Sequence, residues 1–189
     1  MNITNTRSGY GLVAIILHWL MALLIVGLFV LGVYMVELDY YDKWYNSAPW
    51  WHKAFGMVVF LLLVLRLGWV LFNIHPTPLS SYQRWEIIAA RATHILFYVL
   101  LVVICVSGYF ITTAKGAPID IFGWFNIPAL IKLDSDTAKA VGEVHEIAAY
   151  IMAVLFVLHV IATFKHLILD KDVTLIRMLK PFDQKENNS

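Results

Sequence analysis

The sequence predicts an all-α integral membrane protein, a four-helix bundle with up-down-up-down topology. The 189 residues are 60% hydrophobic and 14% charged, with a mean hydropathy of +0.73. Soluble domains are instead about half apolar and a quarter charged. Four apolar segments are each long enough to cross a hydrocarbon layer of about 30 Å. Prolines, which end helices, lie in the links on either side of the third segment.

The four apolar segments define the expected helices. Their expected bounds are, in chain order, 12–36, 51–72, 87–113 and 141–169. The first contains no charged residue and is longer than the apolar part of a signal peptide, so we expect a retained anchor helix. Lys53 and Arg66 are the charged residues of the second. We interpret residues 1–189 as one transmembrane domain, with a short interfacial helix expected around residues 128–132.

The distribution of positive charge predicts the orientation, because cytoplasmic flanks of membrane helices are rich in Lys and Arg. One side carries Arg7, Arg66, Arg84, Arg91, Lys165, Lys171, Arg177, Lys180 and Lys185. The other carries Lys43, Lys53, Lys115, Lys132 and Lys139, accompanied by Glu37, Asp39, Asp42, Asp120, Asp134 and Asp136. We therefore expect both termini in the cytoplasm and a multi-pass protein of the bacterial inner membrane.

Composition also excludes several classes of function. The net charge is +1 and no basic stripe exists, which argues against nucleic acid as a partner. Cys105 is the single cysteine. It excludes an internal disulfide and a metal site built from cysteines.

Two histidines on the last apolar segment carry the main functional signal. His145 and His159 are fourteen positions apart, which is about 1400° of helical rotation and within about 40° of whole turns. Both imidazoles therefore share one helix face, and they stand roughly 21 Å apart along the axis. This arrangement predicts one half of a two-haem ladder, with one axial ligand near each side of the membrane.

Depth in the membrane suggests partners for these two histidines. His52 opens the second helix on the outer side and pairs with His145, whereas His18 lies on the inner side of the first helix and pairs with His159. His94 shares the inner depth, so it is a rival inner ligand or a donor to a haem propionate or a quinone. We expect His166 to lie near propionates or lipid headgroups rather than on iron.

Other interpretations of these residues stay open. A single membrane histidine can serve as a hydrogen bond between helices. A metal site without haem is weaker because the two pairs do not converge, and a proton relay would lack accompanying membrane acids. Arg66 is costly in an apolar helix unless it snorkels to lipid phosphate or pairs with a carboxylate, such as a haem propionate.

Five segments of the chain form a recognisable pattern. They are LHWLMALLI (17–25), WHKAFGMVVFLLLVLRLGW (51–69), ATHILFYVLLVVICVSGYF (92–110), FGWFNIP (122–128) and HEIAAYIMAVLFVLHVIATFKHLILDKDVTLIRML (145–179). Together these segments resemble the prokaryotic cytochrome b561 family of four-helix dihaem proteins. The ligand layout is also similar to that of the cytochrome b subunits of formate dehydrogenases and hydrogenases. Nearly the whole chain takes part in the resemblance, although the family's frequent KHH is Lys165-His166-Leu167 here.

The resemblance implies two b-type haems, each held by two histidines. Carried over to this sequence, the ligands are His18, His52, His145 and His159. It also implies electron transfer to or from a quinone such as ubiquinone, and more specifically superoxide oxidation with quinone reduction. Lys53 and Lys115 are candidates for drawing an anion to the outer side. The alternative is a membrane anchor and electron conduit for a separate dehydrogenase- or hydrogenase-type partner; a structural protein without redox activity is the third hypothesis.

Overall fold

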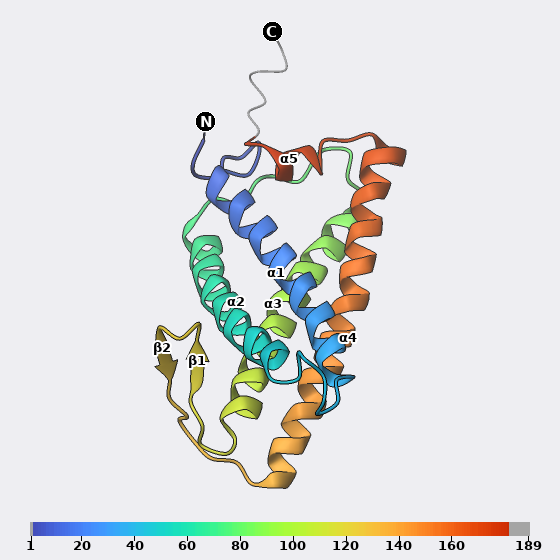
Figure 1. The fold of residues 1–189 in the computed structure, drawn as a ribbon. Coiled ribbons are helices and arrows are strands. Elements are labelled where there is room, and N and C mark those ends of the chain that lie inside the picture. The colour runs from blue at the N-terminus through green and yellow to red at the C-terminus, as the bar shows by residue number, and fades with distance from the viewer. Residues whose placement is uncertain (1, 182–189) are drawn as a thin grey trace.

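The described residues fold into four long helices and a small hairpin (Figure 1). The computed structural model describes residues 2–181. In chain order the elements are α1 (Leu12–Val36), α2 (Ser47–Phe72), α3 (Arg84–Thr113), β1 (Ile119–Ile121), β2 (Phe125–Ile127), α4 (Ser135–Lys165), the π-helical turn η1 (His166–Asp170) and α5 (Ile176–Leu179). Within residues 2–181, four helices are long and apolar enough to cross a membrane, which confirms the predicted fold class.

Helix α1 spans the residues that hydropathy predicts, but the other three helices begin three to six residues earlier. Polar caps explain the difference for α3 and α4, whereas α2 begins without a side-chain cap. The Asp134 carboxylate accepts hydrogen bonds from the backbone N–H groups of Asp136 and Thr137 at the start of α4. At the start of α3, Gln83 and Glu86 form a reciprocal capping box. These first turns are polar, so a hydropathy pattern does not include them.

The helices pack in sequence order, with α1 against α2, α2 against α3, and α3 against α4. A buried apolar layer fills the middle of the bundle and consists of Met21, Val59, Leu63, Leu100, Leu101, Ala148 and Met152. In lipid, such packing rather than exclusion of water holds membrane helices together. The layer separates the two ends of the bundle, where the polar residues lie.

One end of the bundle, here called the terminal end, holds the N-terminal segment, the α2–α3 loop and α5 (Figure 1). These segments are joined by hydrogen bonds. The Thr77 backbone N–H donates to the Arg7 carbonyl at 2.9 Å, and the Arg177 guanidinium donates to the Thr77 carbonyl at 3.0 Å. The predicted cytoplasmic residue Lys185 lies outside the described part of the chain. The opposite end is called the hairpin end.

The loop before α4 forms a β-hairpin over residues 119–127, and residues 128–132 after it are irregular, so the prediction of a helix around residues 128–132 is wrong. Strands β1 and β2 pair antiparallel, and Phe122 and Gly123 at the tip both have positive φ. The Trp50 indole N–H donates to the Asp120 carboxylate at 2.6 Å and ties the hairpin to α2. Alternating apolar residues between two prolines favour strands over a helix here.

Candidate functional site

Two pairs of histidines lie at different depths of the bundle. His52 on α2 faces His145 on α4, with ring centroids 6.3 Å apart and planes at 69°. His18 on α1 faces His159 on α4, with centroids 6.5 Å apart and planes at 62°. The structure thus brings together the pairs that depth predicts, the His52–His145 pair toward the hairpin end and the His18–His159 pair toward the terminal end.

The His145 ring is fixed by helix α3. Its Nδ1 lies 3.0 Å from the Ile104 carbonyl oxygen and 3.1 Å from the Ser107 hydroxyl. Since the hydroxyl donates to the Val103 carbonyl at 2.6 Å, and a carbonyl only accepts, the network assigns the proton to Nδ1 of His145. Its Nε2 makes no hydrogen bond among the described residues and is left to ligate a metal, as second-sphere contacts to histidine ligands typically arrange.

Two glycines lie against the rings of the His52–His145 pair. A Cβ built at Gly32 would lie 3.2 Å from Cε1 of His52, and one at Gly108 would lie 3.1 Å from Cε1 of His145. Nδ1 of His52 is buried close to the Leu28 carbonyl but forms no hydrogen bond of normal geometry in the described structure. The helices around this pair therefore pack directly on the imidazoles.

The His18–His159 pair has a third histidine beside it. The His94 ring on α3 lies 5.9 Å from that of His159, with planes at 63°. His94 is exposed, and Phe97 packs edge-on against His159 at 5.6 Å. His18 and His94 are therefore both close to His159, and ring position alone does not choose between them as its partner.

Arg66 points into the bundle toward this pair. Its Nε donates to the Tyr98 hydroxyl at 3.1 Å, and its Nη2 lies 3.3 Å from Nδ1 of His18. No carboxylate lies within 4.0 Å of Arg66 among the described residues. Nearby Tyr10 is mostly covered, and burial raises its pKa despite the opposing charges of Arg177 and Arg66. The guanidinium thus has neutral partners and remains able to bind an anionic group.

The remaining predicted residues lie away from both pairs. His166 Nδ1 lies 2.8 Å from the Asp170 carboxylate and 2.9 Å from that of Asp172, beyond the end of α4. Glu86, His166 and Asp170 bring ligand atoms within 4.8 Å of one another, but the Lys165 ammonium bonds to both carboxylates and supplies the cation itself. His75 is exposed in the α2–α3 loop. Lys53 and Lys115 are exposed at the hairpin end.

Three contacts were missed from the sequence: the Ile104 carbonyl and Ser107 on His145, and Tyr98 on Arg66. A backbone carbonyl has no residue signature, so Ile104 could not have been found. The adjacent Ser107 and Gly108 were a signal, because a small polar residue beside a glycine marks close helix contact in membranes.

Each histidine pair fits a haem iron. An iron bound by two imidazole nitrogens at about 2 Å places the ring centroids about 6.3 Å apart, because each nitrogen lies about 1.2 Å from its ring centre. The distances of 6.3 Å and 6.5 Å agree with this value, and the 5.9 Å between His94 and His159 is close to it. In the described part of the chain, neither α1 nor α2 packs its backbone closely against α4, so each pair bridges separated helices.

The fold and these paired imidazoles define the class of membrane b-type cytochromes. The model of the prokaryotic cytochrome b561 family matches residues 9–181, and the chain belongs to that family. The chain is 44% identical over 179 residues to "Cytochrome b561 homolog 2" of Escherichia coli (strain K12), a match that covers 95% of each chain. It is 26% identical over 128 residues to "Cytochrome b561 homolog 1" of the same strain, over 68% of this chain and 72% of the relative. Family membership implies b-type haem and electron transfer in a multi-pass membrane protein.

Proposed function

We propose that this protein is a dihaem cytochrome of the bacterial inner membrane that carries electrons between an outer donor and the quinone pool. The observation that carries the proposal is the two histidine pairs at two depths, with both α4 imidazoles on one face. His52 and His145 would hold one haem, and His18 and His159 the other. Bound in this way, b-type haems supply one-electron redox chemistry with both axial positions filled, which disfavours oxygen binding.

The protein's own residues set the conditions for that chemistry. The Ile104 carbonyl fixes the tautomer and the plane of His145. The Arg66 guanidinium places a positive charge near the His18–His159 pair. The apolar layer at mid-depth keeps water from the space between the pairs. Positive charge at the terminal end favours both termini in the cytoplasm.

Haem content of single histidine variants tests the assignment. His52→Ala and His145→Ala should each reduce the pyridine haemochrome count from about two haems per chain to about one, with the same residual spectrum. His18→Ala and His159→Ala should lose the other haem. His94→Ala should keep both. A variant at His94 that loses a haem, while His18→Ala does not, would move the inner ligand to His94.

A lipid-soluble quinone, such as ubiquinone, is the proposed acceptor because it reaches a protein embedded in the bilayer. Superoxide is the specific donor that the family resemblance suggests. In that reaction two superoxide anions each lose one electron and give two O₂, while one quinone gains two electrons and two protons to form quinol. In a stopped-flow experiment, superoxide mixed with oxidised protein should reduce haem within milliseconds. If the haem spectrum stays oxidised, superoxide is not the donor, and electron transfer from another donor remains.

A conduit for a separate redox protein is the second candidate, and a specific observation favours it. The hairpin end is rich in carboxylates, including Glu37, Asp39 and Asp42 in the α1–α2 loop. Negative charge repels an anion such as superoxide and attracts a cationic protein surface.

A further inference from the structure

The two ends of the bundle carry opposite charge. The described residues of the terminal end include eight Lys or Arg and three Asp or Glu, a net charge of +5. The hairpin end has five Lys and eight Asp or Glu, a net charge of −3. The eight acidic residues of the hairpin end are Glu37, Asp39, Asp42, Asp120, Asp134, Asp136, Glu143 and Glu146.

The acids of the two ends also differ in their partners. At the terminal end, Glu86 and Asp170 pair with Lys165, and Asp172 pairs with His166. Over residues 2–181, no carboxylate of the hairpin end lies within 4.0 Å of a Lys, Arg or His nitrogen. Among the described residues, no ion pair neutralises these carboxylates, and the five lysines of the hairpin end leave it a net charge of −3.

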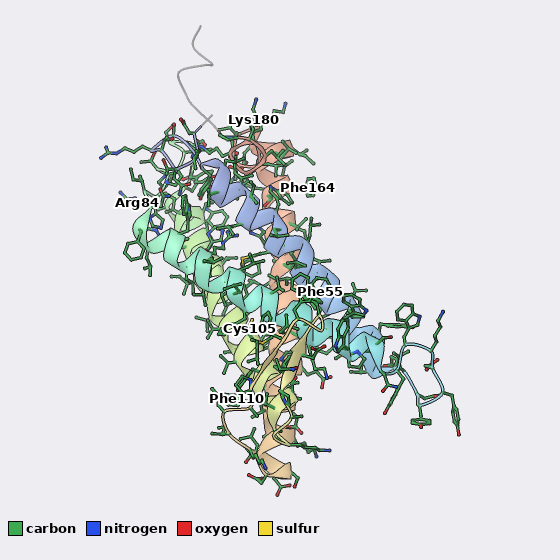
Figure 2. All side chains as sticks on the ribbon, turned by 60° about the vertical axis from the view of Figure 1, so that its left-hand side comes forward. Phe55, Arg84, Cys105, Phe110, Phe164 and Lys180 are labelled. Atoms are coloured by element: carbon green, nitrogen blue, oxygen red, sulfur yellow. The ribbon has the colours of Figure 1, made fainter. Side chains whose placement is uncertain are left out.

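An exposed aromatic loop, residues 37–46, lies among these carboxylates. Tyr40 is 77% exposed and Tyr41 is 92% exposed, and the Tyr40 ring contacts that of Tyr45 at 5.8 Å. The Asp42 carboxylate accepts from the Asp39 backbone N–H at 2.8 Å, which gives the loop a defined turn. Figure 2 shows the α1–α2 loop protruding from the bundle beyond its neighbours. Rigid tyrosines on a protruding loop are typical anchors of protein interfaces.

The aromatic loop is close to the His52–His145 pair along the chain and in depth. Gly32, which lies against the His52 ring, precedes Glu37 by five positions. Phe29 on α1 contacts Tyr150 on α4 at 5.8 Å. Since the two helices run antiparallel, eight further residues from Phe29 and seven from Tyr150 bring Glu37 and Glu143 to similar depth. Glu146 directly follows His145.

We propose that the aromatic loop and the acidic first half of α4 form the docking surface for a redox protein with a positively charged face. The inference rests on the second candidate of the proposed function, the conduit for a separate redox protein, and names the class of that outer partner. One electron passes from the partner to this protein at the hairpin end, the partner is oxidised by one electron, and no bond forms or breaks. Charge complementarity selects the partner, because unpaired carboxylates repel both superoxide and the phosphates of a lipid surface.

The sign of the salt dependence distinguishes the donors. Attraction between opposite charges raises association rates by about 10- to 1000-fold, and salt removes this gain. The Debye length shrinks from about 30 Å at 0.01 M to about 10 Å at 0.1 M. A cationic partner should therefore react more slowly as salt is added, whereas an anion repelled by the same surface should react faster.

The test uses haem-loaded protein in nanodiscs of phosphatidylcholine, with cytochrome c as a cationic probe and succinylated cytochrome c as its anionic counterpart. Dithionite-reduced protein, freed of excess reductant, is mixed with either ferric probe, and haem oxidation is followed by stopped flow at 10 mM and 300 mM salt. Binding of native cytochrome c is measured separately by thermophoresis. We expect the native probe to react at least tenfold more slowly at high salt, and the succinylated probe to be slow throughout.

Two variants locate the effect. Glu37→Gln/Asp39→Asn/Asp42→Asn brings the hairpin end to a net charge of zero and keeps side-chain acceptors in the turn. It should weaken probe binding and remove most of the salt dependence. The control, Arg84→Gln/Lys180→Gln, changes exposed residues of the terminal end (Figure 2) and should react as the unaltered protein does.

Three results would overturn the docking surface. They are a native-probe rate that does not respond to salt, a triple variant that behaves as the unaltered protein does, and a superoxide reaction that slows as salt is added. Tyr40→Ala/Tyr41→Ala adds a fourth criterion. Loss of nanodisc insertion with unchanged probe binding would assign the loop to the lipid interface instead. If dithionite reduces no haem at all, the proposed function fails rather than the docking surface.

Discussion

Gly108→Ala tests whether backbone packing holds the His145 ring in a ligating position. The added methyl carbon would lie 3.1 Å from Cε1 and 3.4 Å from Nδ1 of His145. The ring is held on the same side by the Ile104 carbonyl at 3.0 Å. To accept the methyl group, the ring must move by a few tenths of an ångström away from α3 and stretch that hydrogen bond.

The cost follows from the size of this overlap. Overpacking a closely packed site costs about 1–3 kcal/mol. This corresponds to a loss of affinity of about 5- to 150-fold for the haem that we propose is held by His52 and His145. Gly27→Ala is the matched control, because Gly27 is exposed and a Cβ there meets nothing within 4 Å. That change also favours the helix by about 1 kcal/mol, as Gly→Ala does in helix interiors.

The assay is haem transfer to excess apomyoglobin, followed by the haem content that remains. We expect Gly108→Ala to release one haem faster than the unaltered protein and to leave the residual spectrum of His52→Ala. Gly32→Ala should release the same haem, since its Cβ would lie 3.2 Å from the His52 ring. Equal retention in Gly108→Ala and Gly27→Ala would refute the reasoning, as would loss of the haem assigned to His18 and His159.

Three further predictions concern other parts of the fold. Arg66→Gln removes a positive charge beside His18, so the midpoint potential of the haem proposed at His18 and His159 should fall in a spectroelectrochemical titration. Arg66→Lys keeps the positive charge and should keep most of that potential. Asp134→Ala should increase hydrogen exchange in the first turn of α4, and Asp134→Asn should not. Hydrogen bonds from the Thr137 side chain and backbone lower the pKa of Asp134. The Asp134 cap therefore stabilises the start of α4 fully above the usual pKa of an aspartate, and this stabilisation is lost as pH falls through the lowered pKa. Trp50→Phe removes the bond to Asp120, worth about 1.5–3 kcal/mol with a charged acceptor, and should speed exchange of the hairpin amides.

The helices and the histidine pairs could be predicted because each depends on a periodic pattern. Length and apolarity mark the four helices, and fourteen positions between His145 and His159 fix a common face. Helix starts were missed because caps such as Asp134 are polar. The hairpin was missed because its turn places Phe122, a residue type that rarely adopts positive φ, beside Gly123.

The immediate partners of the histidines could not be predicted for a different reason. The Ile104 carbonyl reaches His145 because of how α3 is rotated against α4, and hydropathy does not determine that rotation. Arg66 shows the same limit. Its position in an apolar helix suggested a carboxylate or a lipid phosphate as partner. In the structure its partners are Tyr98 and His18, two neutral groups from different helices.

The surroundings of the two histidine pairs support different chemistry at each end. The His52–His145 pair is packed against Gly32, Gly108, the Ile104 carbonyl and the Ser107 hydroxyl, which hold the ring positions but do not titrate near neutral pH. The other pair has Arg66, Tyr98 and His94 beside it, groups that can exchange protons or bind an anion. An outer partner that exchanges electrons alone matches the first environment. Quinone reduction also consumes two protons, so within the proposed function it belongs at the terminal end, on the side where His18 and His159 lie.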